Sequence, residues 1–160
     1  SSGIFKDKCI YLITGGMGGL GLLVTKEILS NTHGAKIILT GRSKLSETQN
    51  ALLKELNTLG GMVYYKKLDA SELEHVKNLV KDIQDEYGQL NGVIHSAGVV
   101  ADNFILNKTV DEFRAVLSPK VTGTINLDLA TSAINLDFFI LFSFLENYDS
   151  YIFIIKFYNI

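Results

Sequence analysis

A glycine-rich run from Thr14 to Gly21 constrains this chain more than any other stretch. It follows an apolar run, Cys9 to Ile13, and precedes a helical pattern of leucines. Gly16, Gly18 and Gly21 fit G-x-G-x-x-G, in which the glycines allow a tight turn, a close approach of a pyrophosphate and close packing of helix on strand. The following helix directs its free N–H groups at the anion. We therefore predict a dinucleotide site with contacts from Thr14, Gly15, Gly16, Gly18, Gly19, Leu20 and Gly21.

Short apolar segments alternate with amphipathic helical patterns along the rest of the chain. Because a crossover between parallel strands of one sheet is right-handed, this alternation predicts a parallel sheet with helices on both faces. The expected fold class is α/β, a Rossmann-type doubly wound parallel sheet. The predicted strands are Cys9 to Ile13, Lys36 to Thr40, Met62 to Leu68, Gly92 to His95 and Asp137 to Phe142.

Helix boundaries are predicted from capping residues and glycines. Ser46 with Gln49, and Ser71 with Glu74, have the spacing of capping boxes, in which the two residues satisfy each other's backbone N–H groups. Apolar residues at helical spacing follow each start. We also predict a helix from Thr109 to Ala130, interrupted by the proline at position 119.

The residues after the second and third strands bear on the choice of cofactor. An acidic residue about 20 positions beyond the glycines would bind the ribose hydroxyl of NAD, but this strand is followed by Arg42 and Ser43. An arginine there suits a 2′-phosphate, which favours NADPH. Asp69 and Ala70 follow the third strand, where the carboxylate would accept from the adenine amino group. The alternatives are a solvated Arg42 and an Asp69 that serves only a turn.

Small residues follow the fourth predicted strand. Ser96, Ala97 and Gly98 would let a nicotinamide ring lie close to the backbone, and the alternative is an ordinary turn at the strand end. We interpret the preceding His95 as a strand-end residue near the cofactor.

Composition narrows the class of partner. A net charge of -2 and 47% apolar residues leave no basic face for nucleic acid, and the apolar runs are shorter than the ~20 residues that span a bilayer. We expect a cytoplasmic protein. Cys9 is the single cysteine, so we expect a buried thiol with no disulfide and no metal site. The chain begins with Ser1, which suggests a part of a longer protein.

Five motifs together resemble the ketoreductase domain of polyketide and fatty-acid synthases, in the short-chain dehydrogenase/reductase superfamily. They occur in the family's order and spacing over Tyr11 to Gly21, Leu68 to Ala70, Val93 to Val99, Ser118 to Gly123 and Leu136 to Ser143. The resemblance implies NADPH-dependent reduction of a β-ketoacyl thioester, bound to an acyl carrier, to the β-hydroxyacyl form. Further synthase domains are the implied partners.

The resemblance also implies a set of reacting residues, which this chain carries only in part. Lys120 falls on the family's lysine. The family has two serines at the end of its fifth strand and uses the second; Ser143 matches the first, and Phe144 replaces the second. Using Ser143 as the working serine would require a shift in register. Phe157 occupies the place of the family's tyrosine, and a phenyl ring cannot donate a proton.

Beyond Ser143 the sequence changes character, and residues 145–160 contain no glycine or alanine. We expect a nucleotide-binding domain over residues 1–144, followed by a divergent tail that reflects a frameshift, an unspliced intron or a pseudogene lesion. The fold would then be C-terminally incomplete, with Phe138 to Phe142 on an exposed edge, unless Tyr151 to Tyr158 adds a strand. Two functions compete: an active ketoreductase, and a non-catalytic NADP-binding remnant.

Overall fold

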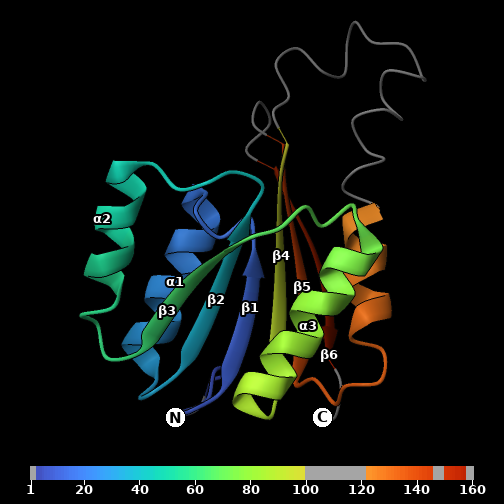
Figure 1. Cartoon of the computed structure of the whole chain (residues 1–160), viewed down its shortest axis with the longest axis horizontal. Coiled ribbons are helices and arrows are strands. Elements are labelled where there is room, and N and C mark those ends of the chain that lie inside the picture. Colours follow the sequence, from blue (N-terminus) through green and yellow to red (C-terminus); the bar gives the residue numbers. More distant parts are fainter. Residues whose placement is uncertain (1–2, 100–121, 146–149, 158–160) are drawn as a thin grey trace, which may run out of the picture.

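A six-stranded sheet forms the centre of the molecule, in the order β3-β2-β1-β4-β5-β6 (Figure 1). The computed structural model describes residues 3–99, 122–145 and 150–157, with side chains over 3–96 and 122–142. The strands are β1 (Ile10–Thr14), β2 (Lys36–Gly41), β3 (Met62–Lys67), β4 (Gly92–Val99), β5 (Phe138–Leu145) and β6 (Ser150–Phe157). The helices are α1 (Gly19–Asn31), α2 (Glu47–Leu56) and α3 (Leu73–Tyr87), and residues 122–130 are also helical.

The strands β1 to β5 run parallel, so their carboxyl ends meet at one edge of the sheet, the upper edge in Figure 1. The register at this edge places Thr14 of β1 beside Thr40 of β2 and His95 of β4. The loops that carry the glycine run, Arg42 and Asp69 leave from the same edge. Ligands of open parallel sheets bind outside the carboxyl ends of the strands.

Two apolar cores lie on opposite faces of the sheet, because successive strand residues alternate between the faces. Ile10, Leu12 and Ile38 pack with α3 and the 122–130 helix, whereas Tyr11 and Ile13 pack with α1 and α2. All five side chains are at most 2% exposed. Full burial of one such side chain stabilises the fold by about 1.5–3 kcal/mol. This two-sided arrangement confirms the predicted Rossmann-type fold.

The last strand of the sheet, β6, pairs antiparallel with β5 over the whole length of both strands (Figure 1). The predicted extra strand in the tail is therefore confirmed. The exposed β5 edge that was expected without this strand does not occur, because β5 hydrogen-bonds to β4 on one side and to β6 on the other. Phe138, Phe139 and Ile140 are 1–5% exposed, because they belong to the apolar cores on the two faces of the sheet.

Local structure differs from the sequence predictions at a few sites. The capping box of Ser46 and Gln49 is present, but α3 begins after Glu72 with no side-chain cap, since Ser71 hydrogen-bonds to Asp69 instead. Within α1, Thr25 is buried, and its hydroxyl donates to the carbonyl of Gly21 at 2.8 Å. The predicted helix start at residue 109 and the proline at 119 lie outside the described residues.

Two residues are more exposed to solvent than the sequence patterns predict. Leu23 belongs to the apolar pattern of α1 but is 64% exposed. Cys9 precedes β1 and is half-buried rather than enclosed in a strand. Partial burial raises the pKa of the Cys9 thiol, which keeps it protonated and less reactive at neutral pH.

Candidate nucleotide-binding site

The turn between β1 and α1 leaves no room for a side chain at three of its glycines, Gly15, Gly16 and Gly21. Gly15 has a φ of +66°, and a Cβ atom there would lie 2.1 Å from the carbonyl oxygen of Ser96 in β4. A Cβ atom at Gly21 would lie 2.6 Å from the Cα of Gly16. The sequence pattern assigned the tight turn to Gly16, whereas the left-handed residue is Gly15. Bare backbone is thus required where α1 packs on the turn.

The N-terminus of α1 faces the carboxyl edge without a capping side chain. Gly18 is the N-cap residue, and the first turn contains no acidic residue. The turn itself is held by two backbone hydrogen bonds, from the N–H of Gly16 to the Thr40 carbonyl at 3.0 Å and from the N–H of Gly18 to the Gly15 carbonyl at 3.1 Å. The free N–H groups and the positive end of the helix dipole make this terminus suited to an anion.

Arg42 and Ser43 follow β2 in a turn whose side chains are both exposed. The hydroxyl of Tyr65, in the neighbouring strand β3, donates to the carbonyl oxygen of Ser43. A Cβ atom at Gly41 would lie only 2.7 Å from the hydroxyl oxygen of the same phenol. Tyr65 therefore supports the turn that carries Arg42. Sequence reasoning missed this residue, and its only signal is the register that pairs Leu39 with Tyr65.

Asp69 follows β3 and forms an Asx turn. Its Oδ1 accepts from the backbone N–H of Ser71 at 3.0 Å and from the Ser71 hydroxyl at 2.7 Å. These bonds, with a smaller contribution from the positive charge of Arg42, lower the pKa of Asp69. The turn role and the predicted adenine role are compatible, because Oδ1 makes the turn and the carboxylate is exposed. Ala70 is half-buried against the core beneath α3.

The side chains of Thr14 and His95 meet inside the sheet. Thr14 Oγ1 lies 2.5 Å from His95 Nδ1, and both residues are nearly inaccessible to solvent, at 2% and 6% exposed. The expectation of His95 at a strand end was wrong, because β4 continues to Val99. The Thr14 side chain is thus engaged within the sheet rather than offered to a nucleotide. For the same reason Ser96, Ala97 and Gly98 are strand residues rather than a turn, and β4 pairs them with β5.

The predicted reacting residues do not come together among the described residues. Lys120 lies outside them. Ser143 is in β5, opposite Ala97 of β4 and Ile152 of β6. Phe157 pairs with Phe138 at the other end of β5, five positions from Ser143. At ~3.4 Å per residue, this is about 17 Å along the strand. The antiparallel direction of β6 thus places position 157 at the amino edge of the neighbouring strands.

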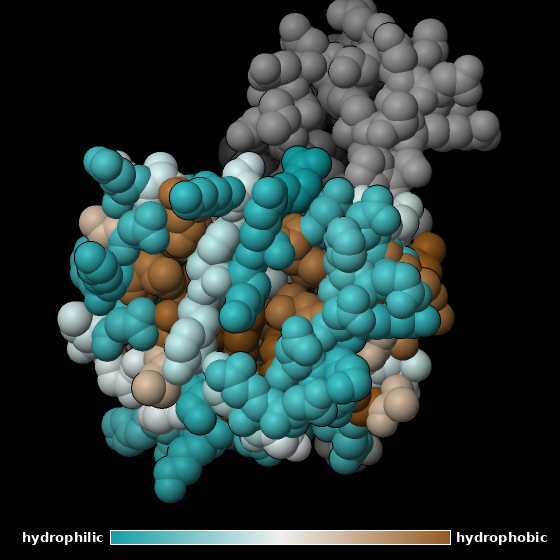
Figure 2. Space-filling model, in the orientation of Figure 1, coloured by the Kyte–Doolittle hydropathy of each residue, from teal (hydrophilic) through white to brown (hydrophobic). Residues whose placement is uncertain are grey.

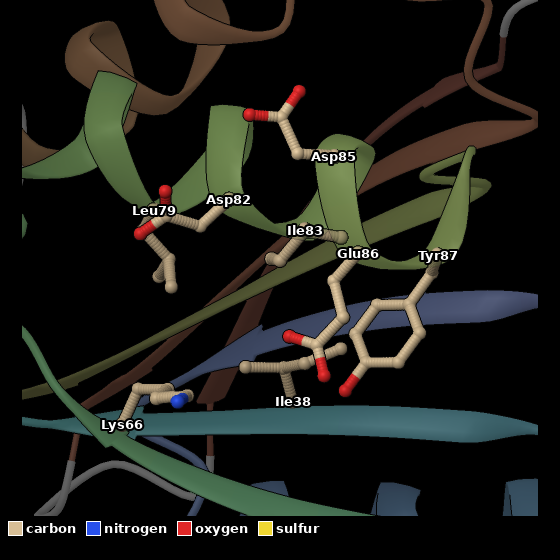
Figure 3. Close-up of a pocket in the computed structure, with 8 residues that line it drawn as sticks. All are labelled: Ile38, Lys66, Leu79, Asp82, Ile83, Asp85, Glu86 and Tyr87. Atoms are coloured by element: carbon tan, nitrogen blue, oxygen red, sulfur yellow. The ribbon is translucent and has the colours of Figure 1, made fainter.

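A groove of about 440 Å³ lies away from this edge, on the face of the sheet between β3 and α3. Figure 2 shows its floor as brown atoms between teal residues. In Figure 3, Leu79, Ile83 and Tyr87 extend from α3 toward the strands, whereas Asp85 points away. Asp85 forms an ion pair with Lys81 at 2.6 Å. The groove contains none of the predicted nucleotide contacts, so it is separate from the candidate site.

Neither a cluster of metal ligands nor a membrane-crossing helix is present among the described residues. Those residues include no group of three or more histidine, cysteine, aspartate or glutamate side chains placed to hold a metal ion. Among the helices that the structure describes, none combines the length and the apolar character needed to cross a bilayer.

Comparison with known proteins places this site in a family. The model of the KR domain family matches residues 9–147. Polyketide synthase PksL of Bacillus subtilis is 51% identical over 139 residues, which cover 87% of this chain and 3% of PksL. A solved ketoreductase domain from the bacillaene assembly line is 45% identical with a TM-score of 0.77, over 85% of this chain and 33% of that one. The chain thus spans only a small part of these relatives.

The fold extends to more distant proteins. A short-chain dehydrogenase from Burkholderia cenocepacia, solved in complex with NADP, has a TM-score of 0.65 at 23% identity, over 80% of this chain and 51% of that one. At this identity the similarity concerns the fold alone. Taken with the glycine turn and the strand order, these matches show that the chain belongs to the KR, or ketoreductase, domain family of polyketide synthases, an oxidoreductase family with the short-chain dehydrogenase fold.

Proposed function

We propose that this chain binds NADPH at the carboxyl edge of β1 to β4. One observation carries the proposal: the glycine turn brings bare backbone to the uncapped N-terminus of α1, and Arg42 leaves the adjacent strand at the same edge. An anion-binding helix end beside an exposed guanidinium suits a ligand with both a diphosphate and a further phosphate. KR and short-chain dehydrogenase proteins generally use NAD(P)H, and the dehydrogenase from Burkholderia cenocepacia was solved with NADP.

Each part of the nucleotide has a matching group in the chain. The turn from Gly15 to Gly19 would hold the diphosphate, and Arg42 with Ser43 would hold the 2′-phosphate. Asp69 and Ala70 would meet the adenine, because they lie in the loop that follows β3, the outermost of these strands. The small residues of β4 would lie beside the nicotinamide. When bound, NADPH supplies a hydride to the substrate.

The reaction that we propose for this site is the reduction of a carrier-bound β-ketoacyl thioester in polyketide synthesis. The support is membership of the KR family and 51% identity to part of PksL. Lys120 would assist proton transfer, and Ser143 would offer a hydroxyl to the developing alkoxide. An acyl carrier and other synthase domains would be the partners, since the relatives are far longer than this chain.

A second candidate, NADPH binding without turnover, is favoured by the geometry of β5 and β6. Phe144 follows Ser143 where the family has its working serine, and β6 carries Phe157 about 17 Å from Ser143 along β5. Neither ring can donate to an alkoxide. The nucleotide half of the site does not depend on either residue, so binding and turnover separate in this chain.

Fluorescence titration of the full chain with NADPH and NADH tests the binding, and the absence of tryptophan leaves the emission of the nucleotide unobscured. We expect tighter binding of NADPH. Arg42→Ala should remove the preference, whereas Lys44→Ala, which also removes an exposed positive charge nearby, should keep it. No binding of NADPH at millimolar ligand would refute the proposal. Loss of NADPH absorbance with a simple β-ketoacyl thioester then distinguishes the active enzyme from the binding protein.

A further inference from the structure

The loop from Leu68 to Glu72 carries the proposed adenine contacts and is held from two sides. The N–H of Leu68 donates to the Gly41 carbonyl of β2 at 2.8 Å, and the N–H of Glu72 donates to the Asp69 carbonyl at 3.1 Å. The first bond fixes the start of the loop to the sheet, and the second closes its turn. Neither bond involves the carbonyl of Ala70.

The 122–130 helix supplies the third support. The side-chain amide of Asn126 donates from Nδ2 to the Ala70 carbonyl at 2.9 Å, across 56 residues of sequence. Asn126 is only 6% exposed, so water does not readily replace this bond. One turn earlier, a Cβ atom at Gly123 would lie 3.4 Å from the Cβ of Ala70 and 3.3 Å from Nε2 of His95. A glycine there lets the helix lie close to the loop.

We infer that Asn126 is a positioning residue for the adenosine half of the proposed nucleotide site. It acts through the Ala70 carbonyl and fixes the backbone on which the Asp69 carboxylate is mounted. Lys120 lies six positions before Asn126 in the sequence, so the segment with the proposed catalytic lysine leads directly into the helix that supports the adenine loop. The inference rests on the proposed function only for the identity of the ligand; the support of the loop is independent of it.

Two variants of the full chain test the inference. Asn126→Leu has a similar volume but no donor, and Asn126→Asp keeps the shape and also lacks the donor. We expect both to weaken the binding of NADPH and of adenosine 2′,5′-bisphosphate about tenfold, which corresponds to about 1.4 kcal/mol. Binding of reduced nicotinamide mononucleotide, which lacks the adenosine half, should not change. A loss that is confined to ligands with adenosine cannot come from general destabilisation.

Thr131→Val is the matched control. Thr131 directly follows the same helix, is 3% exposed, and donates its hydroxyl to the Leu127 carbonyl at 2.7 Å. Its hydroxyl bonds stay within this segment and do not reach the loop. This variant should lower the melting temperature and leave the three affinities unchanged. Equal affinities in wild type and both Asn126 variants would overturn the inference, as would an equal loss for all three ligands.

Amide hydrogen exchange without ligand separates this inference from the proposed function. The N–H groups of Ser71 and Glu72 should exchange faster in the Asn126 variants than in wild type or Thr131→Val, because the loop loses its link to the helix. If wild type binds neither NADPH nor the bisphosphate, the proposed function fails and the exchange rates alone decide whether Asn126 positions the loop. Unchanged rates at both amides would refute that role.

Discussion

Replacement of Gly15 by alanine tests the geometry on which the proposed site depends. At a φ of +66°, the left-handed backbone costs an alanine about 1–2 kcal/mol. The new Cβ would also lie 2.1 Å from the Ser96 carbonyl oxygen, which belongs to the backbone of β4 and cannot rotate away. Relief of such overpacking typically costs a further 1–3 kcal/mol. We expect Gly15→Ala to lower the free energy of unfolding by about 2–5 kcal/mol, a large part of the 5–15 kcal/mol of a typical domain.

Gly19→Ala is the matched control for this experiment. Gly19 begins α1, and no atom lies within 4 Å of the place of its added Cβ. Alanine also favours a helix more than glycine does, so its effect should stay within about 0.5 kcal/mol of wild type. Urea unfolding, followed by far-UV circular dichroism, measures both variants. Equal stability of Gly15→Ala and wild type would refute the left-handed turn, and an equal loss in both variants would refute the contact with Ser96.

Three further predictions concern the site and its chemistry. Arg42→Ala should weaken NADPH binding at least tenfold and leave NADH binding unchanged, measured by nucleotide fluorescence; equal effects on both would remove the 2′-phosphate role. The pKa of the Asp69 carboxyl should lie below its ordinary 3.8, because Ser71 donates to the charged form. The Asx turn should therefore persist at neutral pH and be lost as the pH falls through that lowered pKa. In a ¹³C NMR titration Ser71→Ala should raise the pKa of Asp69, and an unchanged pKa would contradict this cause. If the second candidate function holds, the double variant Phe144→Ser with Phe157→Tyr should bind NADPH without oxidising it in the presence of a β-ketoacyl thioester, because β6 directs position 157 away from Ser143. Turnover in this variant, but not in the unmodified chain, would refute that pairing.

The nucleotide edge could be predicted from sequence because its signals are local. The order strand, glycines, helix fixes the turn at Gly15 to Gly21, and a capping box fixes the start of α2 at Ser46. The predicted capping box at Ser71 was wrong because the nearby Asp69 carboxylate competes for the same donors. The burial of Thr25 could not be read from polarity alone, since its hydroxyl finds a partner inside the helix at Gly21.

The contacts between distant segments required the structure. Tyr65 and Asn126 support the two loops of the proposed site, and neither belongs to a motif. Their partners are backbone carbonyls, which any sequence supplies, so residue types give no signal of the pairing. The direction of β6 could have been predicted in part: a parallel crossover needs a dozen or more residues, and only residues 146–149 separate β5 from β6. Such a connection allows only an antiparallel neighbour.

The two outer strands of the sheet differ in how well they resist pairing with another molecule. β3 ends in Lys66 and Lys67, which are both exposed, and charged residues on an outer strand discourage intermolecular β-pairing. β6 reads Ser-Tyr-Ile-Phe-Ile-Ile-Lys-Phe and has a single charged residue, Lys156. Within the part of the chain that the structure describes, the sheet therefore has one permissive edge rather than two. Association through such an edge ends at a pair of molecules, whereas growth of a fibril would require the lysine-bearing edge as well.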